Sequence, residues 1–191
     1  MSISRDLILE SAAQVFCKKG YNGASMADIA EVVGLQKATL YHHFGSKQEI
    51  LSELLDRAMT IVSENMVLVL RMDEPPDRKL RLAMQTYLKV LCEQPELSSV
   101  LLLEYRSLEK GFYKRHIQKR DDFEEMWRVL VQEGVSSGVF ETQSVSMTVR
   151  AVLGVLNWTI TWYRPEGNLS GEEIADHFSE LFLEGLKVHD S

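Results

Sequence analysis

Cysteine, proline and long apolar runs are scarce in this sequence, which holds two cysteines and four prolines in 191 residues. Cys17 and Cys92 lie far apart in segments with helical apolar spacing, so we expect buried thiols rather than a disulfide or a ligand pair. No apolar run reaches the roughly 18 residues of a membrane span, and Asp6 and Glu10 interrupt the apolar pattern near the N-terminus. We therefore expect a cytoplasmic protein with no membrane partner.

The motifs of common enzymes and metal sites are missing as well. The sequence has no nucleophile elbow, phosphate-binding loop or paired-cysteine motif. A di-metal helical bundle needs Glu-x-x-His on two helices, whereas His177 follows Glu173 at a spacing of four. His42 and His43 are adjacent, so on a helix they point about 100° apart and cannot hold one metal ion together. We expect no enzyme, no cofactor and no metal site.

The net charge of −7 is unevenly spread along the chain. Residues 1–50 hold five lysines and arginines against five aspartates and glutamates, so the whole excess of negative charge follows residue 50. Duplex DNA repels a uniformly acidic protein. This distribution, however, permits an N-terminal module that meets phosphate and an acidic body that does not.

Apolar residues recur at helical spacing along the chain, and no strand-like alternation bounded by hairpin signals is present. Gly20 and Gly34 fit helix ends, Ser25 with Asp28 and Ser46 with Glu49 fit capping boxes, and the proline pair in "DEPPDRK" marks the clearest internal break. The predicted helices cover residues 4–19, 26–33, 37–44, 47 to about 71, 77–93, a run after Pro95, 109–137, 144–163 and 170–188. We therefore predict an all-α fold of about nine helices.

The two short helices predicted at residues 26–33 and 37–44, with the helix at 4–19 before them, fit a helix-turn-helix unit. The second of the two short helices, residues 37–44, would enter the major groove of DNA. The groove is about 12 Å wide and admits one helix, so the exposed face of that helix must be slim and polar. Leu40 and Phe44 face inward, which leaves the other face to Lys37, Ala38, Thr39, Tyr41 and His42. Lys47 and Gln48 begin the next helix, where backbone amides can also grip a phosphate.

The segment "SMADIAEVVGLQKATLYHHFGSKQEIL" resembles the DNA-binding segment of the TetR family of bacterial repressors over about 25 positions. The resemblance implies a helix-turn-helix domain in residues 1–50 and an effector-binding and dimerisation domain in residues 51–191. It implies phosphate contacts at Ser25, Tyr41, His42 and Lys47, and groove-facing positions at Gln36, Lys37, Ala38 and Thr39. Many members have Ser and Gly where this chain has Gln36 and Ala38, which leaves the base preference open.

The same resemblance implies a homodimer on a palindromic operator of double-stranded DNA, with the reading helices roughly 34–36 Å apart. The last two predicted helices fit the pair that forms a four-helix interface between subunits. Gly154 would allow close approach of helices, and the seam would consist of Ile174, Phe178, Leu181 and Phe182. Alternatively, these side chains close the core of the single subunit.

A small-molecule effector that shifts the regulator between two states is the third implication. The candidate effector-binding residues are Tyr87, Tyr105, Arg106, Trp127, Asn157, Trp158, Trp162 and Arg164, with Phe123 as a further wall residue. Aromatic residues at helical spacing are also the normal content of a bundle core. Arg106, Asn157 and Arg164 are polar groups among apolar neighbours, so each either meets a ligand or pairs with a residue such as Glu104 or Glu125.

The segment "LNWTITWYRPEGNLSGEEIADHFSELFLEGL" is similar to the C-terminal part of FadR-like members of the family, which respond to acyl-coenzyme A thioesters. This resemblance implies an acyl-coenzyme A effector, with Trp158, Trp162, Tyr163 and Arg164 near the mouth of its pocket. Two alternatives stay open. One is a regulator of drug efflux that responds to a lipophilic compound, and the other is a helical interaction protein that does not bind DNA.

Overall fold

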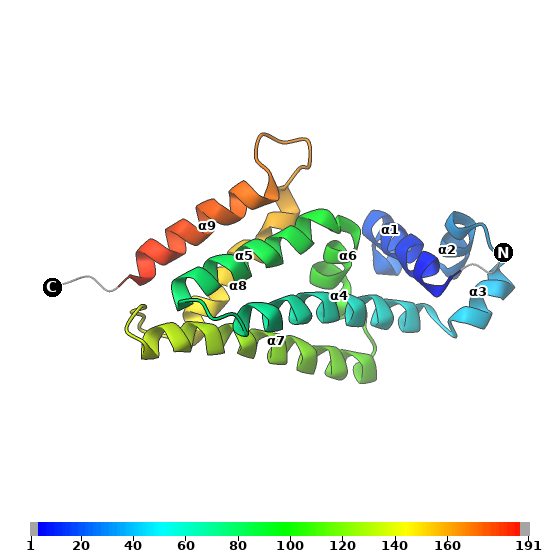
Figure 1. Cartoon of the computed structure of the whole chain (residues 1–191). Helices are drawn as coiled ribbons and strands as arrows, with labels where there is room; N and C mark the ends of the chain where they lie inside the picture. Colours follow the sequence, from blue (N-terminus) through cyan, green and yellow to red (C-terminus); the bar gives the residue numbers. More distant parts are fainter. Residues whose placement is uncertain (1–3, 188–191) are drawn as a thin grey trace. The chain divides into compact units, whose positions relative to one another are not determined.

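The computed structural model describes residues 4–187, and this part of the chain is almost entirely helical (Figure 1). Its nine α-helices are α1 (Arg5–Gly23), α2 (Met26–Val33), α3 (Lys37–His43), α4 (Lys47–Leu70), α5 (Pro76–Glu93), α6 (Pro95–Ser99), α7 (Lys110–Ser136), α8 (Val145–Trp162) and α9 (Gly171–Leu186). The predicted all-α fold is confirmed. Within residues 4–187 the only strand-like pairing is an isolated bridge between Phe140 and Lys187.

The helices begin and end at capping residues and glycines that can be recognised in the sequence. Ser25 and Asp28 form the predicted capping box of α2. Ser46 accepts a hydrogen bond from the Glu49 amide as predicted, but the Glu49 carboxylate accepts from the amide of Gly45. The backbone of α1 leaves helical geometry at Gly20, whose φ of 69° suits glycine, and one more turn continues to residue 23.

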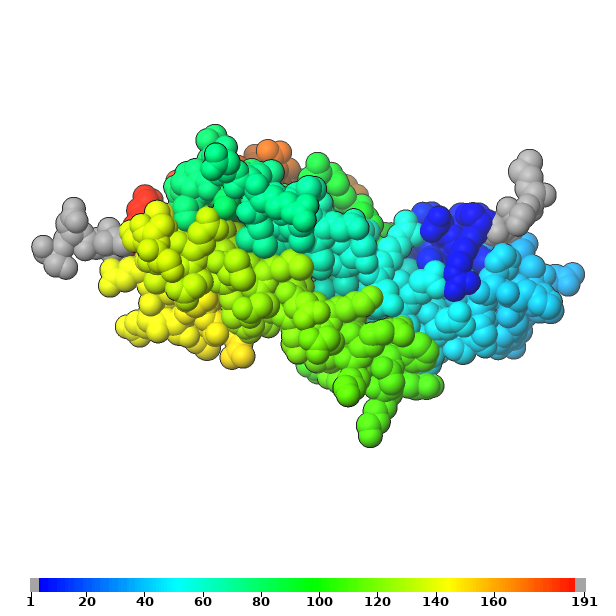
Figure 2. Space-filling view, turned by 60° about the horizontal axis from the view of Figure 1, so that its bottom comes forward, coloured from blue at the N-terminus to red at the C-terminus, as the bar shows by residue number. Residues whose placement is uncertain are grey.

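The described chain divides into two compact units. Unit 1 comprises residues 4–60 and 94–119, and unit 2 comprises residues 61–93 and 120–187. The predicted DNA-binding segment lies within unit 1. The second part of unit 1 contains α6, a π-helical turn at Val100–Glu104 and a 3-10 turn at Tyr105–Ser107, and it packs against α1. The residues that begin α7 lie at the surface, as the green part of Figure 2 shows.

Unit 2 consists of helices that bury an apolar core. α5 packs against α8 and α9, and α8 also meets α9. Met84, Trp127, Leu130 and Leu156 lie in this core with at most 1% of their surface exposed. Gly134 sits so close to the ring of Phe140 that a Cβ atom there would come within 2.0 Å of it, so only glycine fits this turn of α7.

The cysteine prediction is wrong for Cys17, which is exposed on α1, and only partly right for Cys92, which is half-buried. The segment is helical as predicted, but Cys17 lies at the edge of the apolar face that Ile8, Ala12 and Phe16 bury. Both thiols are free. Among the helices of residues 4–187, none combines the length and the hydropathy that a membrane crossing requires.

Candidate nucleic-acid interface and effector cavity

Helix α3 is held at a fixed angle to α2 by a tight glycine turn. Gly34 has φ of 75°, in the left-handed region that favours glycine, and the Leu35 amide donates to the carbonyl of Ala30 at 2.8 Å. Leu40 and Phe44 are completely buried, and they anchor one face of α3 to the core of unit 1. The opposite face of α3 is therefore directed to solvent.

The predicted groove-facing residues do share this solvent face. Tyr41 is 46% exposed, and the Lys37 ammonium lies 5.9 Å from the centre of its ring. Thr39 is half-buried, whereas the remaining residues of the face, Gln36, Lys37, Ala38 and His42, are exposed. The face combines small and polar side chains with one cation, which is the slim surface that a major groove admits.

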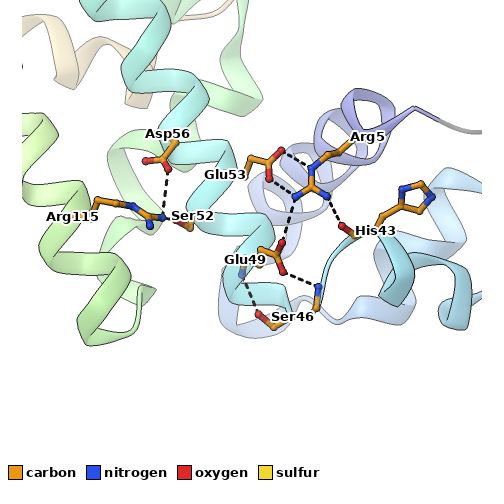
Figure 3. Close-up of polar contacts among 9 residues, drawn as sticks. Arg5, His43, Ser46, Glu49, Ser52, Glu53, Asp56 and Arg115 are labelled. Carbon is orange, nitrogen blue, oxygen red and sulfur yellow. Dashed lines mark hydrogen bonds and ion pairs between the residues drawn. The ribbon is translucent and has the colours of Figure 1, made fainter.

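Arg5 ties this helix to its surroundings, a role that the sequence did not reveal (Figure 3). Its guanidinium donates to the Glu53 carboxylate at 2.8 and 2.5 Å and to Glu49 at 3.4 Å, and it also donates to the His43 carbonyl at the end of α3. The same group lies 3.9 Å from the centre of the Phe44 ring. The start of α1, the end of α3 and the start of α4 are thus joined by one side chain.

Two predicted phosphate contacts, Ser25 and Lys47, also have structural partners. The Ser25 hydroxyl caps α2, and it donates to Asp28 at 2.7 Å. The Lys47 ammonium donates to the carbonyls of Tyr21 and Ala24 at 2.7 and 2.6 Å and lies 4.2 Å from the Tyr21 ring centre. In this structure Lys47 fastens α4 to the end of α1, so a DNA contact would have to share its ammonium with these carbonyls.

Gln48 and Arg115 fasten the second segment of unit 1 to α4. The Gln48 side chain donates to the Ser107 carbonyl at 2.8 Å and accepts from the Glu109 amide at 3.0 Å. Arg115 donates to Ser52 at 2.6 Å and pairs with Asp56 at 3.5 Å (Figure 3). Gln48 therefore has a structural role, and the phosphate contact that its position suggests stays a prediction.

Two of the predicted effector residues, Tyr87 and Trp127, line a small cavity in unit 2 together with Phe123. The centres of the three aromatic rings lie 5.5 to 6.3 Å from one another. The Tyr87 hydroxyl donates to Asn157 at 2.7 Å, and burial raises the pKa of Tyr87, which keeps this hydroxyl protonated. Asn157 thus pairs with a tyrosine, and neither Glu104 nor Glu125 is its partner in this bond.

The structure does not bring the other effector candidates to this cavity. Tyr105 stacks on Tyr113 in unit 1, and the prediction that Arg106 lies among apolar neighbours is wrong. Arg106 is exposed and bonds to the Tyr105 hydroxyl at 3.2 Å, because it sits in a short surface turn rather than on the inner face of a helix.

Three further candidates lie on the surface of unit 2. Trp158 is 66% exposed, Trp162 is 43% exposed, and Arg164 is exposed and donates to the Tyr163 carbonyl. Trp158 shares a helical face with Gly154, four residues earlier on α8. It therefore belongs to an outer face of this helix rather than to the cavity wall.

The candidate dimer residues of α9 fall on two sides of that helix. Leu181 is 71% exposed, and with Phe182 it lines a groove of about 800 Å³ whose other wall includes Met147 of α8, itself 60% exposed. Phe178 is half-buried, and Gly154 on α8 is exposed. Ile174 is only 3% exposed, so it closes the core of the single subunit, as the alternative held.

Helix α3 follows a tight turn, has one face buried in the core of unit 1 and has the other face in solvent. In an all-α chain, this arrangement is that of a helix-turn-helix DNA-binding protein. The family described as "Bacterial regulatory proteins, tetR family" matches residues 8–54, and "Tetracyclin repressor-like, C-terminal domain" matches residues 73–186. The chain belongs to the TetR family of transcriptional regulators, which are not enzymes.

Known proteins resemble the chain over nearly its whole length. The HTH-type transcriptional repressor KstR2 of Mycolicibacterium smegmatis is 24% identical over 196 residues, with 95% of this chain and 90% of that protein covered. The crystal structure of the TetR family regulator PfmR from Thermus thermophilus has a TM-score of 0.88 and 38% identity, with 97% and 100% covered. AibR in complex with isovaleryl coenzyme A and operator DNA has a TM-score of 0.86 and 24% identity, with 92% and 96% covered.

Proposed function

We propose that the chain is a cytoplasmic homodimeric repressor whose two α3 helices read a palindromic operator, and that an acyl-coenzyme A thioester releases it from DNA. The proposal that α3 reads DNA is supported by one observation, namely that one face of this helix is buried and the other is exposed. Leu40 and Phe44 are fully buried, whereas Tyr41 is 46% exposed between them in sequence. A helix anchored in this way can present polar side chains to the major groove while its apolar face stays packed in the core of the domain.

The exposed apolar surface of α8 and α9 supports the dimer. Met147, Trp158 and Leu181 are each at least 60% exposed, and Met147 and Leu181 line one groove, which is the kind of continuous apolar surface that marks a protein–protein contact. A second copy that covers both helices would remove these side chains from water and would make the same contacts in both directions, as a two-fold interface requires. The two reading helices would then meet the operator together.

The effector part draws its support from the cavity in unit 2 and from the fold. Tyr87, Phe123 and Trp127 form an aromatic wall that suits a hydrocarbon chain. AibR, which has the same fold, was crystallised with isovaleryl coenzyme A and operator DNA together. An acyl-coenzyme A is therefore the effector class that we propose for this chain.

An electrophoretic mobility shift with DNA from the promoter region of the protein's own gene tests the DNA-reading part. We expect a shift that weakens steeply between low and high salt, because Lys and Arg contacts release counterions from phosphate. Tyr41→Ala should weaken binding about tenfold through the loss of one phosphate contact. Tyr113→Ala removes the same side chain from an exposed position on α7 and should leave binding unchanged. Equal affinity of all three proteins would remove α3 from the proposed interface.

Release from DNA tests the effector part. A panel of acyl-coenzyme A thioesters of different lengths is added to the complex with DNA, and thermal stabilisation of the free protein is recorded in parallel. We expect at least one thioester to release the DNA and to raise the melting temperature. Release by a lipophilic drug and by no thioester would instead favour the regulator of drug efflux.

A further inference from the structure

Trp127 on α7 has a buried hydrogen-bond donor with no acceptor. Its side chain is 1% exposed, and among residues 4–187 no acceptor lies within hydrogen-bond distance of the indole Nε1. A buried donor of this kind weakens the folded state, so nearly all such groups in proteins have a partner. The missing acceptor is therefore expected from a molecule other than the protein.

The cavity that the indole lines is the place where such an acceptor can sit. Its walls come from three helices, α4, α5 and α7, with Tyr87 from α5 and with Phe123 and Trp127 from α7. Its volume is about 10 Å³, which is close to the space that one water molecule needs. A ligand pocket usually measures about 300–1,000 Å³, so an effector must push these side chains apart.

The cavity wall is uncharged. The lining residues include no lysine, arginine, aspartate or glutamate. A carboxylate or phosphate brought here would lose its hydration without gaining a cation from the wall, which is costly. A carbonyl oxygen on a hydrocarbon chain has no such cost, because one N–H donor satisfies it and the aromatic rings of Tyr87 and Phe123 accept the chain.

We propose that Trp127 donates its Nε1–H to the carbonyl oxygen of an acyl thioester and so selects the thioester over the free fatty acid. This inference rests on the proposed effector class. The Tyr87 hydroxyl is already engaged with Asn157 at 2.7 Å, which leaves Trp127 as the donor of the aromatic wall. Arg120, whose charge acts on Tyr87, is not among the residues that line the cavity.

Isothermal titration calorimetry with matched ligands tests this assignment. The probes are isovaleryl- and octanoyl-coenzyme A, the S-alkyl thioethers of the same length that lack the carbonyl, and the free acids. We expect the wild type to bind the better thioester about tenfold more tightly than its thioether, which is the effect of one hydrogen bond. Free acids should bind more weakly still, because the wall offers them no cation.

Two variants locate the effect on one side chain. Trp127→Phe keeps an aromatic ring but removes the donor, so it should bind thioester and thioether with equal affinity. Trp162→Phe removes the donor from a tryptophan that is 43% exposed on α8, and it should keep the tenfold ratio. A ratio that survives in Trp127→Phe, or a free acid that binds as tightly as the thioester, overturns the assignment.

An observation on the wild-type protein covers the case in which Trp127→Phe does not fold. The three tryptophan indole N–H signals are recorded by NMR in ¹⁵N-labelled protein and assigned with the Trp158→Phe and Trp162→Phe variants. The thioester should move the Trp127 signal downfield and the thioether should not, and an equal response to both overturns the assignment. If neither ligand binds while DNA binding is intact, the proposed effector class fails as well, which distinguishes the two failures.

Discussion

Unit 1 and unit 2 place the polar bonds between their helices on different elements, α4 in unit 1 and α5 in unit 2. Polar side chains cross between helices in unit 1, where Arg5, Lys47, Gln48 and Arg115 all connect α4, or the turn before it, to other segments. In unit 2 several such bonds come from α5 instead, among them those of Lys79 to Glu133, Gln85 to Asp176 and Tyr87 to Asn157. Directional bonds around α4 suit a unit that must present α3 at a fixed angle.

The two units also differ in charge. Residues 1–60 and 94–119 hold 11 lysines and arginines against 10 aspartates and glutamates, a net charge of +1, and the rest of the sequence holds 10 against 18, a net charge of −8. The second segment of unit 1 therefore adds positive charge to the reading unit, as the exposed Lys110, Lys114 and Arg115 illustrate. Phosphate attracts the first unit and repels the second, which favours one orientation of the protein on DNA.

The largest expected effect comes from a charge placed on the surface of unit 2. Leu181→Glu puts a carboxylate in the proposed dimer surface, so the protein should become a monomer and lose operator affinity by at least about 100-fold, because two linked half-sites bind far better than one. Analytical ultracentrifugation and a mobility shift measure both changes. Leu68→Glu, at another leucine that is 60% exposed, should remain a dimer. A dimeric Leu181→Glu protein would place the interface elsewhere.

A smaller effect is expected from the polar connections of unit 1. Arg5→Ala removes the side chain that joins α3 to α4, and operator affinity should fall about tenfold, comparable to the loss of one hydrogen bond to a charged group. Arg78→Ala, which breaks an exposed ion pair with Glu74 at the start of α5, should not change it. A mobility shift measures both variants. If Arg5→Ala binds like the wild type, the angle of α3 does not depend on this connection.

The Gln48 bonds sharpen the comparison further, since they hold two segments of unit 1 together. Gln48→Ala should speed amide hydrogen exchange in residues 94–119 and should lower the free energy of unfolding by about 1–2 kcal/mol, the value of two hydrogen bonds. Hydrogen-exchange mass spectrometry and urea unfolding give the two values. Gln132→Ala, at an exposed position of α7 in unit 2, is the matched control. Unchanged exchange in residues 94–119 would show that the bonds to Ser107 and Glu109 do not hold this segment.

The smallest effect concerns the pH dependence of the α2 capping box. Hydrogen bonds from Lys19 and Ser25 lower the pKa of Asp28 to about 2. Because the folded-state pKa lies below the ordinary value of 3.8, the stabilisation is complete above that value and is lost as the pH falls towards 2. NMR titration of the Asp28 carboxyl carbon measures the pKa, and Lys19→Met should raise it. A titration at the ordinary value would mean that the capping box is not formed in solution.

The helices and the solvent face of α3 could be predicted from the sequence because their signals are local. Glycine at residue 34, the Ser25 and Asp28 pair, and the spacing of Leu40 and Phe44 each act within a few residues. The grouping of residues 94–119 with the N-terminal helices could not be predicted, since it depends on contacts such as that between Gln48 and Ser107, 59 positions apart. Arg5 was missed for the same reason.

The effector candidates were less predictable than the reading face. The sequence spacing of an aromatic residue on a helix is the same whether the residue lines a cavity or lies on an outer face. Trp127 and Trp158 therefore could not be distinguished from the sequence, although Trp127 is 1% exposed and Trp158 is 66% exposed. Their helical registers relative to neighbouring helices separate them, and the sequence does not contain that information directly. The surroundings of Arg106 were predicted wrongly because Arg106 lies in a short 3-10 turn, whereas the apolar residues near it in the sequence suggest a helix.

The connection through Arg5 has a consequence for the evolution of operator choice. It fixes the end of α3 through the His43 backbone carbonyl, which every amino acid possesses, and through the ring of Phe44 behind the helix. Gln36 and Ala38, by contrast, are exposed. Under the proposed reading of DNA by α3, gene duplicates would acquire new target sequences by exchanges at these two sites while the geometry of the helix is inherited intact.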